Sequence, residues 1–87
     1  MFSVMPDARE QLARLSRGGS RELPIAVVSA AVIEVRASAL PCPHCGGSYR
    51  LDEHVAPARA LRRVDVRCRQ CSRARSLWFR IVDREPN

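Results

Sequence analysis

Lysine is absent from this chain of 87 residues, and all fifteen of its basic residues are arginine. This usage is typical of a GC-rich genome, so the formal net charge of +6 is either functional or a by-product of codon bias. The excess of positive charge lies in residues 42–82, where arginines outnumber acidic residues by six. A basic surface of this kind favours nucleic acid, anionic lipid or acidic proteins as partners.

Long apolar runs and a secretory leader are also lacking. The first residues carry no basic segment followed by an apolar core, and the most apolar stretch, 24–35, is interrupted by Ser29 and Glu34. We therefore expect a cytoplasmic protein that does not bind a membrane. In a reducing compartment, its four cysteines are not expected to form disulfides.

Catalytic signatures are missing as well. The sequence contains no Ser/His/Asp set, no phosphate-binding loop and no metal site with an open fourth position. We expect neither an enzyme nor a small-molecule substrate. Aromatic residues make up 5% of the chain, which leaves Tyr49 and Trp78 as the candidates for stacking on a nucleobase. For Trp78 we favour packing under the N-terminal segment instead.

The chain is short enough to need a staple, because a domain of this size buries only ~60% of its unfolded surface. Its four cysteines form two pairs, Cys42-x-x-Cys45 and Cys68-x-x-Cys71, separated by 22 residues. Each turn can direct two sulfurs to one point, and a hairpin of the intervening length brings the pairs together. The spacing predicts one structural Zn²⁺ held by four thiolates. A redox dithiol, a disulfide framework and a four-thiolate iron centre are the alternatives.

Two histidines lie within this region. His44 sits between the first two cysteines, where we expect it to point to solvent because four thiolates already fill the metal shell. His54 is expected at the surface, near the end of a strand.

The segments CPHCGG and VRCRQCSRARSLWF, within residues 41–82, resemble a zinc ribbon. The resemblance implies a small zinc-stabilised β domain, with a three-stranded antiparallel sheet and two zinc knuckles that place the metal on the four cysteines. The chain departs from the pattern at Ser72, where glycine is usual and a positive φ is often needed. Zinc contributes ~10–16 kcal/mol at such sites, against a net stability of ~5–15 kcal/mol for a typical domain. We expect the ribbon to be unfolded without metal.

Four segments are predicted along the chain. Residues 1–23 hold an amphipathic helix over 6–17 and a linker, and residues 24–40 form an apolar segment that packs on the sheet or extends it. Within that segment the β-branched residues favour a strand over 32–38 rather than a helix, and Pro41 ends it. The ribbon follows at 41–82, and residues 83–87 are a tail.

Alternating residues within the ribbon predict strands over 48–55, 61–68 and 75–82, with a turn around Pro57. In the first strand, one face is expected to carry Tyr49, Leu51 and Val55, and the other Arg50, Asp52 and His54. In the last strand, one face is expected to carry Leu77, Phe79 and Ile81, and the other Trp78, Arg80 and Val82.

Three functions compete. The first is a structural or protein-interaction module, in which residues 24–40 cover the Trp78 face or dock a partner. The alternative is a nucleic-acid-binding or transcription-associated ribbon whose guanidinium groups contact phosphates. The contact candidates for that role are Arg63, Arg67, Arg69, Arg73 and Arg75. The third is a transcript-cleavage ribbon with Mg²⁺ on Asp52 and Glu53, which is disfavoured because strand alternation would point these acids to opposite faces.

Overall fold

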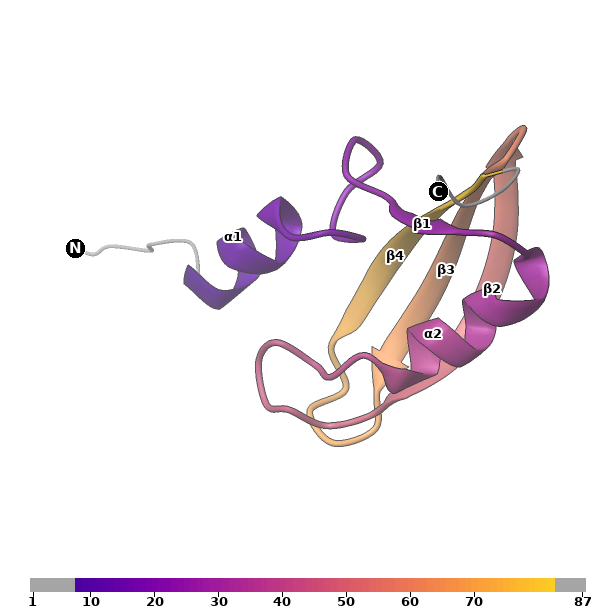
Figure 1. Ribbon diagram of the computed structural model, residues 1–87. Helices are drawn as coiled ribbons and strands as arrows, with labels where there is room; N and C mark the ends of the chain where they lie inside the picture. Colours follow the sequence, from indigo (N-terminus) through magenta and orange to yellow (C-terminus); the bar gives the residue numbers. More distant parts are fainter. Residues whose placement is uncertain (1–7, 83–87) are drawn as a thin grey trace.

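The computed structural model describes residues 8–82, which form a four-stranded mixed sheet with a helix packed on one face (Figure 1). In chain order the elements are α1 (Ala8–Leu15), β1 (Ile25–Val27), a 3₁₀ turn (Ala30–Val32), α2 (Ile33–Ala39), β2 (Tyr49–Ala58), β3 (Leu61–Cys68) and β4 (Ala74–Ile81). The predictions for residues 1–7 and 83–87 lie outside the described residues.

The sheet has the order β1-β4-β3-β2, with β2, β3 and β4 antiparallel and β1 parallel to β4. The three expected ribbon strands are present, but the expected three-stranded antiparallel sheet is wrong, because β1 adds a fourth strand. Ile25 and Val27 of β1 are buried, opposite Phe79 and Ile81 of β4. The apolar start of the segment 24–40 therefore extends the sheet, and the rest crosses to the far edge, where β2 begins.

Helix α2 makes that crossing, so the predicted strand over 32–38 is wrong. Ile33 and Ala37 are both 0% exposed, and a spacing of four residues puts them on one side of a helix. Val35, which would share a face with Ile33 in a strand, is 68% exposed. The Ser29 side chain caps the preceding turn by accepting from the Ala31 N–H at 3.1 Å. The helix ends at Ala39, because Leu40 is extended ahead of Pro41.

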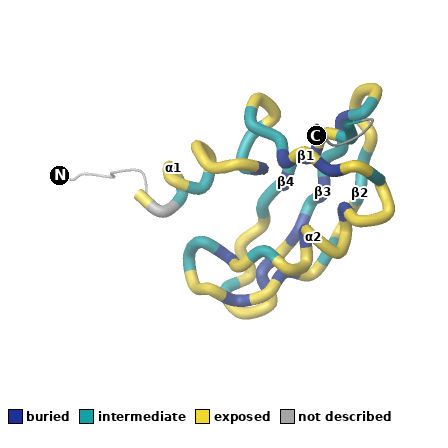
Figure 2. The backbone as a smooth tube through the Cα atoms, viewed as in Figure 1, coloured by how far each residue is buried: buried dark blue, intermediate teal, exposed yellow. Residues whose placement is uncertain are grey.

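The core lies between α2 and the sheet, on what we call the inner face (Figure 2). Helix α2 contacts β2 and β3 there. The expected inner set on β4 is confirmed: Leu77 and Phe79 are buried and Ile81 packs against the core. Helix α2 therefore covers this face, and not the Trp78 face for which the segment 24–40 was proposed as a cover.

A bulge in β2 changes which residues face the core. The pairing with β3 shifts between Leu51 and Glu53, so Asp52 is an extra residue in the strand. Beyond the bulge, His54 pairs with the buried Val64 and lies on the inner face, where its Nδ1 is 3.0 Å from a Glu34 carboxylate oxygen of α2. The predicted polar-face position of His54 is wrong for this reason, because alternation does not survive an inserted residue.

Helix α1 lies beside the sheet rather than on it (Figure 1). The predicted apolar stripe of this helix is not covered, since Leu12 is 65% and Leu15 74% exposed. The linker that follows is anchored to β4, because the Gly18 carbonyl accepts from the Trp78 N–H at 2.9 Å. Gly18 has a φ of +87°, and a Cβ there would come within 2.7 Å of the Ile25 Cδ1. Trp78 is half-buried, with the Arg21 guanidinium 5.9 Å from its ring.

Candidate metal centre

Two matching turns hold the four cysteines at the end of the sheet where β2 begins and β3 ends. In the first turn, the Cys42 N–H donates to the Gly47 carbonyl and the Gly46 N–H donates to the Cys42 carbonyl, at 2.9 and 2.8 Å. In the second turn, Cys68, Ser72 and Arg73 repeat the pattern at 2.9 and 3.1 Å. Gly46 and Ser72 occupy equivalent places, with φ values of +77° and +66°. The positive φ expected at Ser72 is confirmed.

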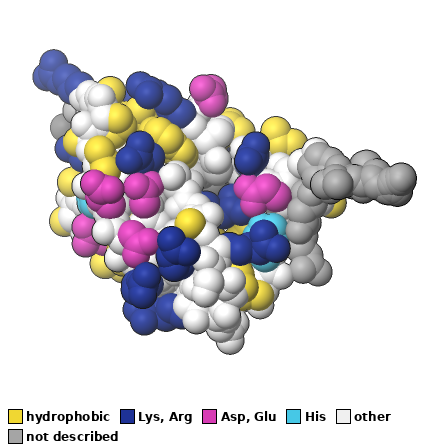
Figure 3. Space-filling model, turned by 180° about the vertical axis from the view of Figure 1, so that it is seen from behind, with side chains coloured by type: hydrophobic (Ala, Val, Ile, Leu, Met, Phe, Trp, Pro, Cys, Tyr) yellow, Lys and Arg dark blue, Asp and Glu magenta, His cyan; other side chains and the backbone are white. Residues whose placement is uncertain are grey.

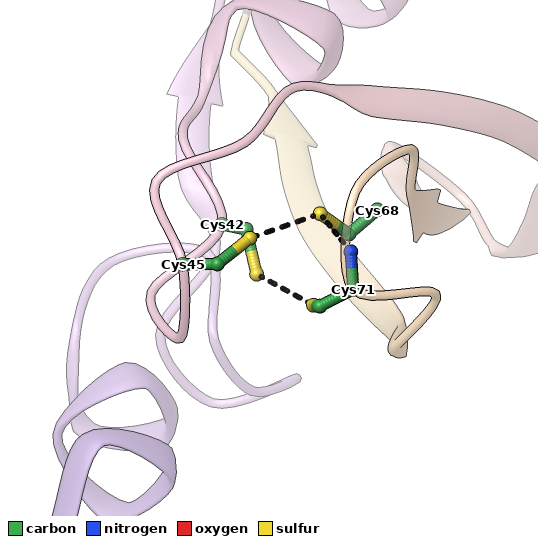
Figure 4. Close-up of side chains that lie close together, drawn as sticks. All are labelled: Cys42, Cys45, Cys68 and Cys71. Carbon is green, nitrogen blue, oxygen red and sulfur yellow. Dashed lines mark hydrogen bonds between the residues drawn. The ribbon is translucent and has the colours of Figure 1, made fainter.

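The four side chains point toward one another across the gap between the two turns (Figure 4). Their Sγ atoms all lie within 4.8 Å of one another. The Cys42 Sγ is 3.7 Å from that of Cys71, and the Cys45 Sγ is 3.4 Å from that of Cys68. A tetrahedron with Zn–S bonds of about 2.3 Å has edges of about 3.8 Å. The donor set and its spacing therefore fit one tetrahedral metal ion.

Backbone amides point at the sulfurs and favour their anionic form. The Gln70 and Cys71 N–H groups each donate to the Cys68 Sγ at 3.4 Å. The Cys71 amide is the main cause that lowers the pKa of the Cys68 thiol to about 6. The Gly47 amide lowers the pKa of the Cys45 thiol, but the hydrogen bonds with the neighbouring sulfurs, that of Cys68 first, outweigh it and raise that pKa to about 12. Because the four Sγ atoms lie within 4.8 Å of one another, the thiols titrate as one coupled group.

The two sides of the cluster differ in their access to solvent. Cys42 and Cys68 are buried in the core, Cys71 is half-buried, and Cys45 is exposed. Gly47 lies on the buried side, and there is no room for a side chain at this position. A Cβ there would come within 3.0 Å of the Cys68 Sγ and 2.7 Å of the Gln70 Oε1. Glycine at this position lets the two turns approach closely enough to share one ion.

His44 is turned inward, so the expectation that it points to solvent is wrong. Its side chain is 6% exposed, and its Nε2 lies 2.9 Å from the Glu10 Oε1 of α1. The Arg75 guanidinium donates to the same oxygen, and its side chain is 10% exposed. The hydrogen bond to His44, followed by the charge of Arg75, lowers the pKa of the Glu10 carboxyl. Glu10 thus attaches helix α1 to the first turn of the metal centre. Glu10 precedes His44 by 34 residues, and nothing in the sequence indicated this contact.

The arginines expected to contact a partner are separated by the fold. Arg75 is bound to Glu10, and Arg63 is bound to the carboxylate of Asp65 at 3.1 and 3.3 Å. Arg67, Arg69 and Arg73 are exposed at the end of the sheet that carries the second turn. Their role in binding stays a prediction.

The acidic pair Asp52 and Glu53 is placed differently from the sequence expectation. Because of the bulge, both lie on the outer face, opposite α2, rather than on opposite faces. Figure 3 shows this side of the molecule, where several acidic side chains lie close together with basic side chains next to them. Asp52 is bound to Arg50 and Arg67, and Asp65 is bound to Arg63 and the Ser76 hydroxyl. Within residues 8–82, the cysteine cluster is the one group of three or more such side chains with metal-binding spacing.

No family model, curated protein or solved structure matches this chain. Over the described part of the chain, the helices are too short and too polar to cross a bilayer. The site must therefore be interpreted from its own chemistry.

Proposed function

We propose that this protein is a non-enzymatic zinc-binding module, in which one structural Zn²⁺ on Cys42, Cys45, Cys68 and Cys71 holds the fold together. The convergence of four Sγ atoms within 4.8 Å of one another carries this proposal. Four thiolates favour zinc among the abundant divalent ions, and they leave no coordination position open for a substrate. A closed shell of this kind stabilises a structure and does not activate water.

The position of the cluster explains why a structural metal suits this fold. The two turns join the end of α2, the start of β2, the end of β3 and the start of β4. A bound ion therefore ties together all the elements around the core except β1. The core itself is small, with eleven buried residues in one cluster. Chains of this size commonly need such a staple.

We further propose that the module acts by contacting another macromolecule, and that a protein is the first candidate. Leu12 and Leu15 present an uncovered apolar stripe on α1 while Glu10 fixes the helix to the metal centre. The bulge and Pro57 in β2 disfavour strand addition at that edge of the sheet. The helix is therefore the better docking element for a partner that offers an apolar groove.

A nucleic acid is the second candidate, because exposed arginines gather beside the second cysteine turn. Arg63 and Arg75 are engaged by carboxylates and do not line the hollow beside that turn, so this role would depend on a smaller set than the sequence analysis expected.

The test of the zinc proposal is metal analysis of the purified protein, combined with thiol titration. We expect one zinc per chain, and four thiols that react only after the metal is released. A Cys68→Ser variant should lose the zinc, whereas Ser48→Ala, beside the first turn, should keep it. Protein that carries no metal and still shows a cooperative melting transition would refute the proposal.

A further inference from the structure

A small hollow opens beside the second cysteine turn, at the end of the outer face. Its volume is about 250 Å³, and its lining consists of Arg50, Arg67, Cys68, Arg69 and Ser72. The side chains of Arg50 and Arg67 are 58% and 44% exposed, so the hollow is open to solvent. Arg73 follows directly in the chain and is also exposed. We call Arg50, Arg67, Arg69 and Arg73 the arginine cluster.

The arginine cluster has more positive charge than its surroundings neutralise. Arg50 and Arg67 share a single carboxylate, with their Nε atoms 3.4 and 3.7 Å from the two oxygens of Asp52. Arg69 and Arg73 form no ion pair with any acidic residue in the described part of the chain. A zinc ion with four thiolates carries a net charge of −2. The four guanidinium groups together outweigh the negative charge of the metal site and of the Asp52 carboxylate, and one positive charge is left over.

The Arg67 guanidinium and the backbone of the second turn are held in place before any ligand arrives. The Arg67 Nη1 donates to the Ser72 carbonyl at 2.9 Å, inside the tight turn that follows Cys68. The Arg69 N–H donates to the Ser48 carbonyl at 2.9 Å, which fixes the second turn against the start of β2. Guanidinium groups with a fixed fork of N–H donors match the oxygens of a phosphate group.

From these contacts we infer that the arginine cluster is a binding site for the phosphate backbone of a nucleic acid. This inference rests on the proposed zinc module, because the metal holds the turn that carries Arg69 and Arg73. The cluster spreads its donors over an open surface instead of enclosing one anion, which suits a ligand with repeated phosphates.

Base recognition is not part of this site. Tyr49 is buried in the core, and Trp78 lies half-buried near Arg21, away from the hollow lining. Binding should therefore be insensitive to sequence and dominated by charge. Arg50, which the sequence analysis did not select, belongs to the site, whereas Arg63 and Arg75 do not.

The experiment is fluorescence anisotropy of the zinc-loaded full chain against labelled duplex DNA and single-stranded RNA of mixed sequence. With up to four phosphate contacts, affinity should fall roughly 100-fold between about 50 and 200 mM salt. The test variant combines Arg69→Ala with Arg73→Ala. The matched control combines Arg59→Ala with Arg80→Ala, which removes the same charge from exposed arginines at the far end of the hairpin.

The test variant should bind at least about tenfold more weakly, with a salt slope reduced by about two, while the control stays close to wild type. Equal losses in both variants would show that net charge alone drives binding and would overturn the site. Binding to phosphatidylglycerol vesicles or inorganic phosphate, but not to nucleic acid, would overturn the assigned ligand.

Zinc content and melting curves accompany each titration and separate the two proposals. A zinc-loaded, folded protein that ignores nucleic acid at low salt overturns this inference and leaves the zinc module intact. Metal-free protein that melts cooperatively and binds nucleic acid through Arg69 and Arg73 would instead refute the zinc module.

Discussion

Replacing Ile33 by alanine tests whether α2, rather than the strand expected from the sequence, completes the core. Ile33 is 0% exposed and belongs to the main core cluster. The substitution removes three carbon groups, each worth about 0.8 kcal/mol of burial, or about 2.4 kcal/mol in total. The cavity left behind raises the expected loss to about 2–5 kcal/mol. For a domain of this size, that lowers the melting temperature by at least about 10 °C.

The matched control is Val35→Ala, which removes a β-branched side chain from the same segment. In the helix, Val35 is 68% exposed, so its loss should change stability by less than about 0.5 kcal/mol. In a strand, Ile33 and Val35 would share a face and would be equally buried. The assay is thermal unfolding of zinc-loaded protein, followed by far-UV circular dichroism and by the fluorescence of Trp78, the single tryptophan. Equal destabilisation by the two substitutions would refute the helix.

Three further predictions concern the metal and the two turns. Chelation should unfold the chain, because ~10–16 kcal/mol of zinc binding exceeds the stability left to so small a core; an unchanged circular dichroism spectrum would contradict this. Glu10→Gln should speed hydrogen exchange in α1 about tenfold, because it weakens the charged hydrogen bonds that hold this helix, against no change for the exposed Glu22→Gln. Because the pKa of Glu10 is lowered in the fold, its contribution is complete at neutral pH and is lost only as the pH falls through the folded-state pKa. Ser72→Gly should raise stability by about 0.5–1 kcal/mol in denaturant titrations, since Ser72 has a φ of +66°; a lower midpoint would show that its hydroxyl has a structural role.

The metal cluster was predictable because its signal is local. Two residues separate the cysteines within each pair, and this spacing by itself defines a turn that directs both sulfurs to one side. The hairpin strands were equally predictable, because apolar and polar residues alternate along β3 and β4 and one face of these strands is buried. The positive φ at Ser72 followed from its equivalence to a glycine in the knuckle pattern.

The sequence by itself determined where the cysteine turns and the three ribbon strands lie, because turn chemistry and alternation act between near neighbours. Tertiary structure decided the rest. Residues 33–39 became a helix because that conformation buries Ile33 and Ala37 against β2 and β3 while crossing the sheet. The bulge at Asp52 reversed the facing of His54, and Glu10 reached His44 and Arg75 from α1. Each of these outcomes depends on a contact with residues distant in the chain, and the spacing of residues within one segment does not indicate such a contact.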